Sequence, residues 1–110
     1  MIVFNGLPIL IAQLESLDQL GTLFVNSREW STTPESATFL LLSGDNELEN
    51  LDDNGAPILA ISNNVEYLLY VEIFQSVIEL QMEKKPDSSL RDYIYAINHY
   101  LEYDDFYEPR

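Results

Sequence analysis

The segment from Leu90 to Leu101 has the clearest amphipathic pattern in the chain, and it constrains the fold more than any other feature. Its apolar side chains recur every three or four residues, which is the period of an α-helix that buries one face. Ser89 and Asp92 resemble a shortened capping box, with Asp87 and Ser88 as the other candidate caps. The sequence therefore predicts a last helix with an apolar face made of Leu90, Tyr93, Ile94, Ile97, Tyr100 and Leu101.

Three earlier segments are also predicted to be helical. The first begins at Pro8, which suits a first turn, and its apolar residues recur at helical spacing until Gly21 offers a C-terminal cap. A short helix is expected over residues 57–62, where proline stands at the start and two asparagines follow. A longer helix carries Ile73 and ends by about Lys85, because the next residue is proline.

Three segments are predicted to be strands. Residues 22–25 are mostly β-branched or aromatic and precede a turn signal, which is typical of an edge strand. Residues 37–43 hold an unbroken apolar run, which indicates a central strand buried on both faces. Residues 65–71 form a third strand that leads into a helix with little or no loop. We therefore expect one α+β domain over residues 1–110, with a small three-stranded sheet packed against three to four helices in a single pair of layers.

The balance of charges limits the partners that the chain can take. Nineteen Asp and Glu residues face five Lys and Arg, for a formal charge of −14, yet 46% of the residues are hydrophobic. The apolar content is enough to support a folded core, so the charge must lie largely on the surface. Such a surface repels nucleic acids and anionic membranes, and it attracts basic proteins. We expect a protein partner, and neither nucleic acid nor membrane.

The chain contains no cysteine, so disulfides and thiolate metal sites are excluded, in keeping with a cytoplasmic location. The apolar N-terminus could be read as a signal peptide, but no basic residue precedes Arg28, and Asn5-Gly6 and Pro8 interrupt the run. No stretch reaches the length of a membrane span. We expect a cytoplasmic monomer.

No pattern for catalysis or cofactor binding is present. Phosphate-binding glycine motifs are missing, and His99 is the only histidine, so a catalytic triad or a metal site would depend on it alone. Adjacent acids such as Asp52-Asp53 or Asp104-Asp105 seldom aim at one substrate bond. We expect His99 to be a partly exposed structural residue. The prediction is a protein that is not an enzyme, with no catalytic residue, metal or cofactor.

Nine of the nineteen acids lie in two short segments. The first runs from Asp45 to Asp53 and could be a calcium loop, a solvated loop or a protein-docking surface. An EF-hand loop needs Gly at its sixth position and Glu at its twelfth, where this chain has Asn50 and Ala56. The candidate partner-binding residues in this first segment are Asp45, Glu47, Glu49, Asp52 and Asp53.

The second acidic segment, residues 100–108, mixes acids with aromatic residues. One interpretation is a helix end with Tyr100, Leu101 and Phe106 packed inward. The other is a docking surface in which carboxylates pair with Arg or Lys and tyrosines stack on guanidinium groups. Its candidate contacts are Tyr103, Asp104, Asp105, Tyr107 and Glu108.

Trp30 lies in a polar connection between two predicted strands, either as a lid on the core or as an interface anchor.

One set of motifs consists of Lys85-Pro86-Asp87-Ser88-Ser89-Leu90, Ala96, Tyr100 and Asp104-Asp105-Phe106, together with Val65-Glu66-Tyr67-Leu68-Leu69 before a helix and Trp30 after a strand. These motifs resemble those of small acidic bacterial immunity proteins from contact-dependent inhibition and related polymorphic toxin systems. The resemblance covers roughly residues 9 to 107 and includes no catalytic residue. It implies an intracellular protein that binds a cognate toxin domain, often a nuclease.

The charge leads to the same class of function, because a nuclease must be basic where it holds phosphates. We therefore expect an immunity protein that binds a cognate basic toxin domain and blocks its active site or an adjacent exosite. The alternative is a DNA mimic or phage-type inhibitor of a nucleic-acid enzyme, which needs carboxylates spaced like phosphates along one elongated face.

Overall fold

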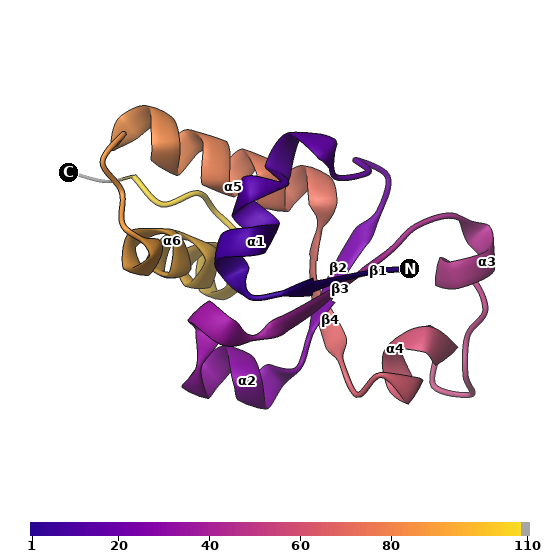
Figure 1. The fold of residues 1–110 in the computed structure, drawn as a ribbon. Helices are drawn as coiled ribbons and strands as arrows, with labels where there is room; N and C mark the ends of the chain where they lie inside the picture. The colour runs from indigo at the N-terminus through magenta and orange to yellow at the C-terminus, as the bar shows by residue number, and fades with distance from the viewer. Residues whose placement is uncertain (109–110) are drawn as a thin grey trace. The chain divides into compact units, whose positions relative to one another are not determined.

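The computed structural model describes residues 1–108, which form an α+β protein (Figure 1). The chain divides into two compact units, Met1–Val71 and Glu72–Arg110, and each is described by itself. A single domain over residues 1–110 stays a prediction. The elements are β1 (Ile2–Asn5), α1 (Leu7–Ala12), the 3-10 helix η1 (Leu14–Ser16), β2 (Thr22–Val25), α2 (Ser27–Thr32), the 3-10 helix η2 (Pro34–Ser36), β3 (Thr38–Leu42), α3 (Asp45–Leu48), α4 (Ile58–Ser62), β4 (Glu66–Tyr70), α5 (Val71–Lys84) and α6 (Leu90–Tyr103).

The sheet of the first unit has four strands in the order β1-β3-β2-β4, and every neighbouring pair is antiparallel. The predicted number of three strands was one too low, because β1 is a short segment whose pairing with β3 is a long-range contact. The number of helices was also too low, with six α-helices within residues 1–108. The prediction of an edge strand at residues 22–25 was wrong. β2 lies between β3 and β4, and all four of its residues are buried.

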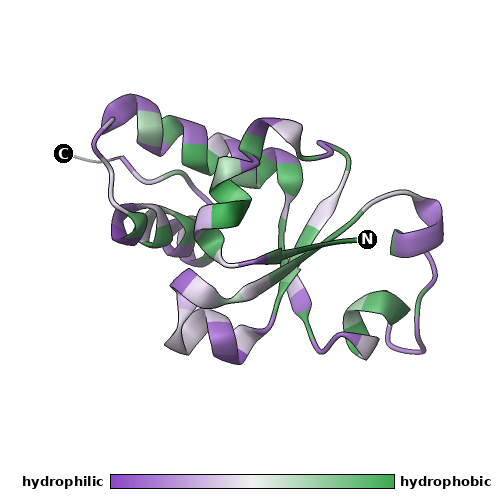
Figure 2. Ribbon diagram, in the orientation of Figure 1, coloured by the Kyte–Doolittle hydropathy of each residue, from purple (hydrophilic) through white to green (hydrophobic). Residues whose placement is uncertain are grey.

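β3 is the central strand that its apolar run predicted. Leu40 and Phe39 point to opposite faces of the sheet, as neighbours in a strand must, and their exposed fractions are 2% and 0%. One face packs against α3 and α4, which lie together beside the sheet in Figure 1. The cluster on that face consists of Phe24, Leu40, Leu42, Ala60 and Val65, with Leu48 and Leu59 at its margin. Figure 2 shows β3 as mainly hydrophobic and α3 as hydrophilic.

A β-bulge interrupts β4. Leu23 pairs with Leu69 and Phe24 with Tyr67, so Leu68 is an extra residue in the ladder. The bulge shifts the alternation of side chains, and Tyr67 and Tyr70 lie on the same side of the strand, with their ring centroids 5.6 Å apart. Both tyrosines are more than half exposed.

The first helix is shorter than its sequence pattern predicted. α1 ends at Ala12, and the chain continues as η1 and a turn in which the Asp18 side chain accepts the N–H of Leu20 at 2.9 Å. This local bond competes with the helix. Leu20 is therefore 86% exposed, and Gly21 is no cap but a buried residue immediately before β2.

Residues 27–32 form α2, where only a polar connection was expected. Asn26 caps this helix, because its side-chain oxygen accepts the N–H of Glu29 at 3.0 Å. The short helix brings the ring of Trp30 over Phe39, with ring centroids 5.9 Å apart in edge-to-face geometry. Trp30 thus covers the core and is half-buried.

The second unit contains α6 and all of α5 except its first residue. β4 leads into α5 without a loop, as its sequence predicted, and α6 begins with the full capping box of Ser89 and Asp92. Along α6, Tyr93, Ala96 and Ile97 are buried. No helix within residues 1–108 is long and apolar enough to span a membrane.

Candidate docking surfaces

Four rings gather along one side of α6, and we call them the aromatic cluster: Tyr95, His99, Tyr103 and Tyr107. The first three follow one another at four-residue steps, which places them on one helix face. Beyond the helix end the chain brings Tyr107 back over this face, with its ring centroid 4.8 Å from that of Tyr95 and 5.4 Å from that of His99. The rings of His99 and Tyr103 are 4.7 Å apart.

Four exposed carboxylates surround the end of α6 beside this cluster. Asp104 is the C-terminal cap in the left-handed conformation (φ 55°), and the last turn of the helix contains no basic residue. A helix C-terminus carries partial negative charge, so acids there are repelled rather than stabilised. At the surface, the Nζ atom of Lys84 lies 2.8 Å from the carboxylate of Glu108. The four carboxylates are Glu102, Asp104, Asp105 and Glu108.

This negative potential acts on a neighbouring phenol. Burial raises the pKa of Tyr100 above its ordinary value, and the charges of Asp104 and Asp105 raise it further. On the other side of the helix end, the ring centroids of Tyr100 and Phe106 lie 5.2 Å apart. The inward-packed interpretation is confirmed for Tyr100 and Phe106, which are half-buried, and wrong for Leu101, which is 41% exposed. The acids are exposed, and the docking surface stays a prediction.

The predicted contacts of this segment come together at the end of α6. Tyr103 is 61% exposed, Asp104, Asp105 and Glu108 are also exposed, and Tyr107 is half-buried in the aromatic cluster. Sequence reasoning missed Tyr95 and treated His99 in isolation. Their four-residue spacing with Tyr103 was the signal that could have identified the cluster.

The first acidic segment differs from the second, because two of its carboxylates are bonded to other groups of the folded chain. Glu47 accepts the N–H of Ser43 at 2.9 Å and contacts the N-terminal ammonium group of Met1. The ammonium group and then the Ser43 N–H lower the pKa of Glu47. Asp52 accepts the N–H groups of Asn54 at 3.0 Å and Ala56 at 2.9 Å, and so closes a turn.

The other predicted acids of this segment, Asp45, Glu49 and Asp53, are exposed. Asp45 opens the short helix α3 instead of lying in a loop. Within residues 1–108, no group of three or more His, Cys, Asp or Glu side chains is arranged to hold a metal ion.

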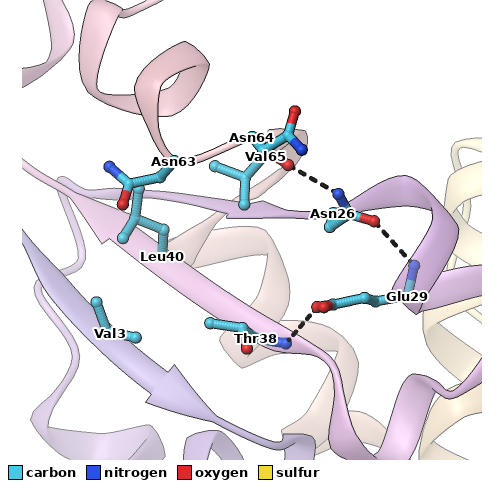
Figure 3. Close-up of a pocket in the computed structure, with 8 residues that line it drawn as sticks. All are labelled: Val3, Asn26, Glu29, Thr38, Leu40, Asn63, Asn64 and Val65. Atoms are coloured by element: carbon cyan, nitrogen blue, oxygen red, sulfur yellow. Dashed lines mark hydrogen bonds between the residues drawn. The ribbon is translucent and has the colours of Figure 1, made fainter.

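A polar pocket of about 270 Å³ lies beside β3 in the first unit (Figure 3). Its polar groups are bonded to the fold: Asn26 donates to the backbone oxygen of Asn64 at 2.9 Å, and Glu29 accepts the N–H of Thr38 at 3.0 Å. These bonds join α2 to β3 and to the turn before β4. The pocket is therefore a structural junction.

A second cavity of about 430 Å³, which we call the apolar hollow, lies between α4 and β4. Phe24, Ala60 and Val65 are its buried members, while Ile61 and Tyr67 are exposed at 48% and 56%. Its lining consists of Phe24, Gly55, Ala56, Pro57, Ala60, Ile61, Val65, Glu66 and Tyr67.

The model of one protein family, described as a domain of unknown function (DUF7716), matches residues 7–108. The chain belongs to the DUF7716 family. The match spans both units, from the start of α1 through the acidic segment after α6. No curated protein and no solved structure matches the chain.

Proposed function

We propose that this DUF7716 domain is an immunity-type protein that binds a cognate basic toxin domain, of the nuclease class, in the cytoplasm. The contact surface is the aromatic cluster with the four carboxylates at the end of α6. The bound protein blocks the active site of the toxin domain or an adjacent exosite. In this function the domain performs no catalysis.

The observation that carries the proposal is the excess of negative charge at the C-terminal end of α6, where Lys84 pairs with one of the four carboxylates. Acids at this end of a helix face the partial charges of the last carbonyl groups, and no basic residue lies in the last turn. Lysine or arginine side chains of a partner relieve this repulsion when they dock. The arrangement favours binding of a cation over stability of the free protein.

The aromatic cluster supplies the second half of the surface. Tyr95 and Tyr103 are 58% and 61% exposed, and ring area that stays in water adds no burial energy to the stability of the free protein. Tyrosines provide stiff contact area, and their faces stack on guanidinium groups. Rings beside carboxylates therefore suit arginine, because its guanidinium group can stack on a ring and pair with a carboxylate.

The choice of a nuclease toxin rests on charge and on the resemblance to immunity proteins. An enzyme that cleaves nucleic acid needs a basic surface to hold phosphates. An inhibitor that must act before damage occurs gains from a fast, electrostatically steered encounter. The formal charge of −14 provides that steering.

The test uses the purified chain and the candidate toxin domain encoded beside its gene. We expect stoichiometric inhibition of the nuclease activity and an association rate that falls steeply from low to high salt. Absence of binding, or a rate that is indifferent to salt, would falsify the proposal. Binding that depends on the carboxylates but not on the rings would instead favour the DNA-mimic alternative.

A further inference from the structure

The apolar hollow has a lining that suits an apolar side chain and no polar ligand. Its only charged lining residue is Glu66, whose carboxylate already accepts the N–H of Ser27 at 3.0 Å. A polar small molecule needs several converging donors and acceptors to fix its orientation. The rest of the lining is aliphatic, aromatic or glycine.

The exposed apolar surface continues from the hollow along β4. The rings of Phe24 and Tyr67 meet edge to face at 6.4 Å, and Tyr70 extends the row. The bulge at Leu68 places the two tyrosines on one side of the strand. A hollow with a buried floor and an exposed aromatic rim has the anatomy of an anchor site, where one partner residue supplies much of the binding energy.

Acidic residues belong to two of the segments that line this site. Glu66 lines it, Asp52 is bonded to Ala56 in its wall, and the exposed Asp53 lies two residues before Gly55. No lysine or arginine lines the hollow. A segment that inserts an apolar side chain therefore meets negative charge from β4 and from the segment before Gly55.

We infer that the apolar hollow receives a large apolar side chain, aromatic or aliphatic, from a partner segment that carries lysine or arginine on both sides. This inference rests on the proposed function for the identity of the partner, to which it adds a second and apolar contact. Recognition is divided: the acids attract any basic segment, and the hollow selects those with an anchor.

The experiment titrates the full chain, labelled for NMR, with two short peptides: Lys-Lys-Phe-Lys-Lys and Lys-Lys-Ala-Lys-Lys, both blocked at their ends. We expect the Phe peptide to bind about tenfold more tightly than the Ala peptide, because burial of the ring adds apolar contact. We also expect its largest amide shifts around the hollow, at Ala56, Ile61 and Tyr67. This comparison needs no variant.

A matched pair of variants sharpens the test. Ile61→Lys places a charge in the wall of the hollow, and Ile9→Lys places the same charge on α1, where the side chain is equally exposed (49% against 48%). We expect the first to weaken binding of the Phe peptide several-fold more than the second. Equal effects of the two variants, or equal affinity for the two peptides, overturn the inference.

The outcomes also separate the inference from the proposed function. Suppose that changes at the end of α6 abolish toxin binding and Ile61→Lys has no effect. The proposed function is then retained, and the inference about the hollow is rejected. Selective binding of the Phe peptide without any binding of a basic toxin domain removes the proposed function and retains an anchor site of this chemistry.

Discussion

The Nζ atom of Lys85 lies 3.0 Å from the Oδ2 atom of Asp92, and the same oxygen accepts the N–H of Ser89 at 2.9 Å. One carboxylate thus completes the capping box of α6 and pairs with the residue that follows α5. The Ser89 N–H and then Lys85 lower the pKa of Asp92, and Asp92 raises the pKa of Lys85.

The first prediction concerns the pH dependence of this contact. Because the pKa of Asp92 is lower in the folded protein, its contribution to stability is complete above the unfolded value near 3.8. It disappears as the pH falls through the folded pKa. We expect Asp92→Asn to destabilise the protein at neutral pH and to match the parent at strongly acidic pH, measured by urea unfolding. Asp53→Asn, an exposed acid with the same change of charge, is the control. A difference between parent and Asp92→Asn that stays constant with pH would contradict the assignment.

The second prediction concerns the crowded position of Gly21. A Cβ atom there would meet a side-chain carbon of Leu41 at 3.0 Å and the backbone oxygens of Asp18 and Leu42 at 3.1 Å. Backbone atoms cannot easily move, so we expect Gly21→Ala to cost about 1 to 3 kcal/mol of unfolding free energy. Gly55→Asn is the control, because that position has open space and asparagine tolerates its φ of 83°. Equal stability of the two variants would refute the crowding argument.

The third prediction measures the potential at the end of α6. Asp104→Asn removes a charge that raises the pKa of Tyr100, so we expect the phenol to titrate at lower pH in this variant. It should remain above the ordinary value, since burial is the larger cause. NMR titration of the Tyr100 ring gives the pKa directly. The raised pKa stabilises the fold below pH 10, and this contribution is lost as the pH rises through the folded value. An unchanged pKa in Asp104→Asn would show that the carboxylate does not act on the phenol.

The fourth prediction separates local from general charge in partner binding. We expect the double variant Asp104→Asn with Asp105→Asn to slow association with the toxin domain about tenfold more than Glu15→Gln with Glu35→Gln, which changes the net charge equally. Asparagine also tolerates the left-handed φ of position 104. Stopped-flow association at low salt measures both rates. Equal slowing by the two pairs would mean that only net charge matters.

The fifth prediction concerns the rings. Tyr103→Ala should raise the dissociation rate about tenfold or more while changing the association rate little, because a packed aromatic contact acts after the encounter. Ile9→Ala, an exposed apolar residue on α1 (49% against 61%), is the control, because it lies outside both the aromatic cluster and the apolar surface along β4. A similar dissociation rate for both variants would exclude the cluster from the interface.

Elements with strong local signals were predictable from the sequence. α6 has its capping box and apolar stripe, and β3 has an unbroken apolar run that only a strand buried on both faces needs. The position of β2 inside the sheet and the existence of β1 were not predictable, because both depend on pairing between distant segments. The early end of α1 coincides with a local side-chain bond, in which the Ser16 hydroxyl donates to the backbone oxygen of Gln13 at 2.8 Å, and such bonds compete with a favourable helical pattern.

The candidate site was predictable in composition but not in geometry. Tyr103 and the three acids after α6 were predicted as exposed, and they are, whereas Tyr107 is half-buried. The return of Tyr107 over Tyr95 and His99 required the structure. Likewise, no pattern in the first acidic segment distinguishes Glu47 and Asp52, which bond to the backbone, from Asp53, which lies exposed.

The exposed edge strand β1 suggests a second role for the excess of acids, which is to prevent association between copies of the chain. It lies at an edge of the sheet and exposes Ile2 and Val3 by about half, which is the kind of edge on which a second copy can add a strand. At neutral pH each copy carries a formal charge of −14, and the mutual repulsion keeps such edges apart. As the pH falls toward the ordinary carboxyl pKa, the repulsion is lost while the apolar edge remains. The charge therefore also protects the fold from aggregation, and any change that neutralises many acids at once removes this protection.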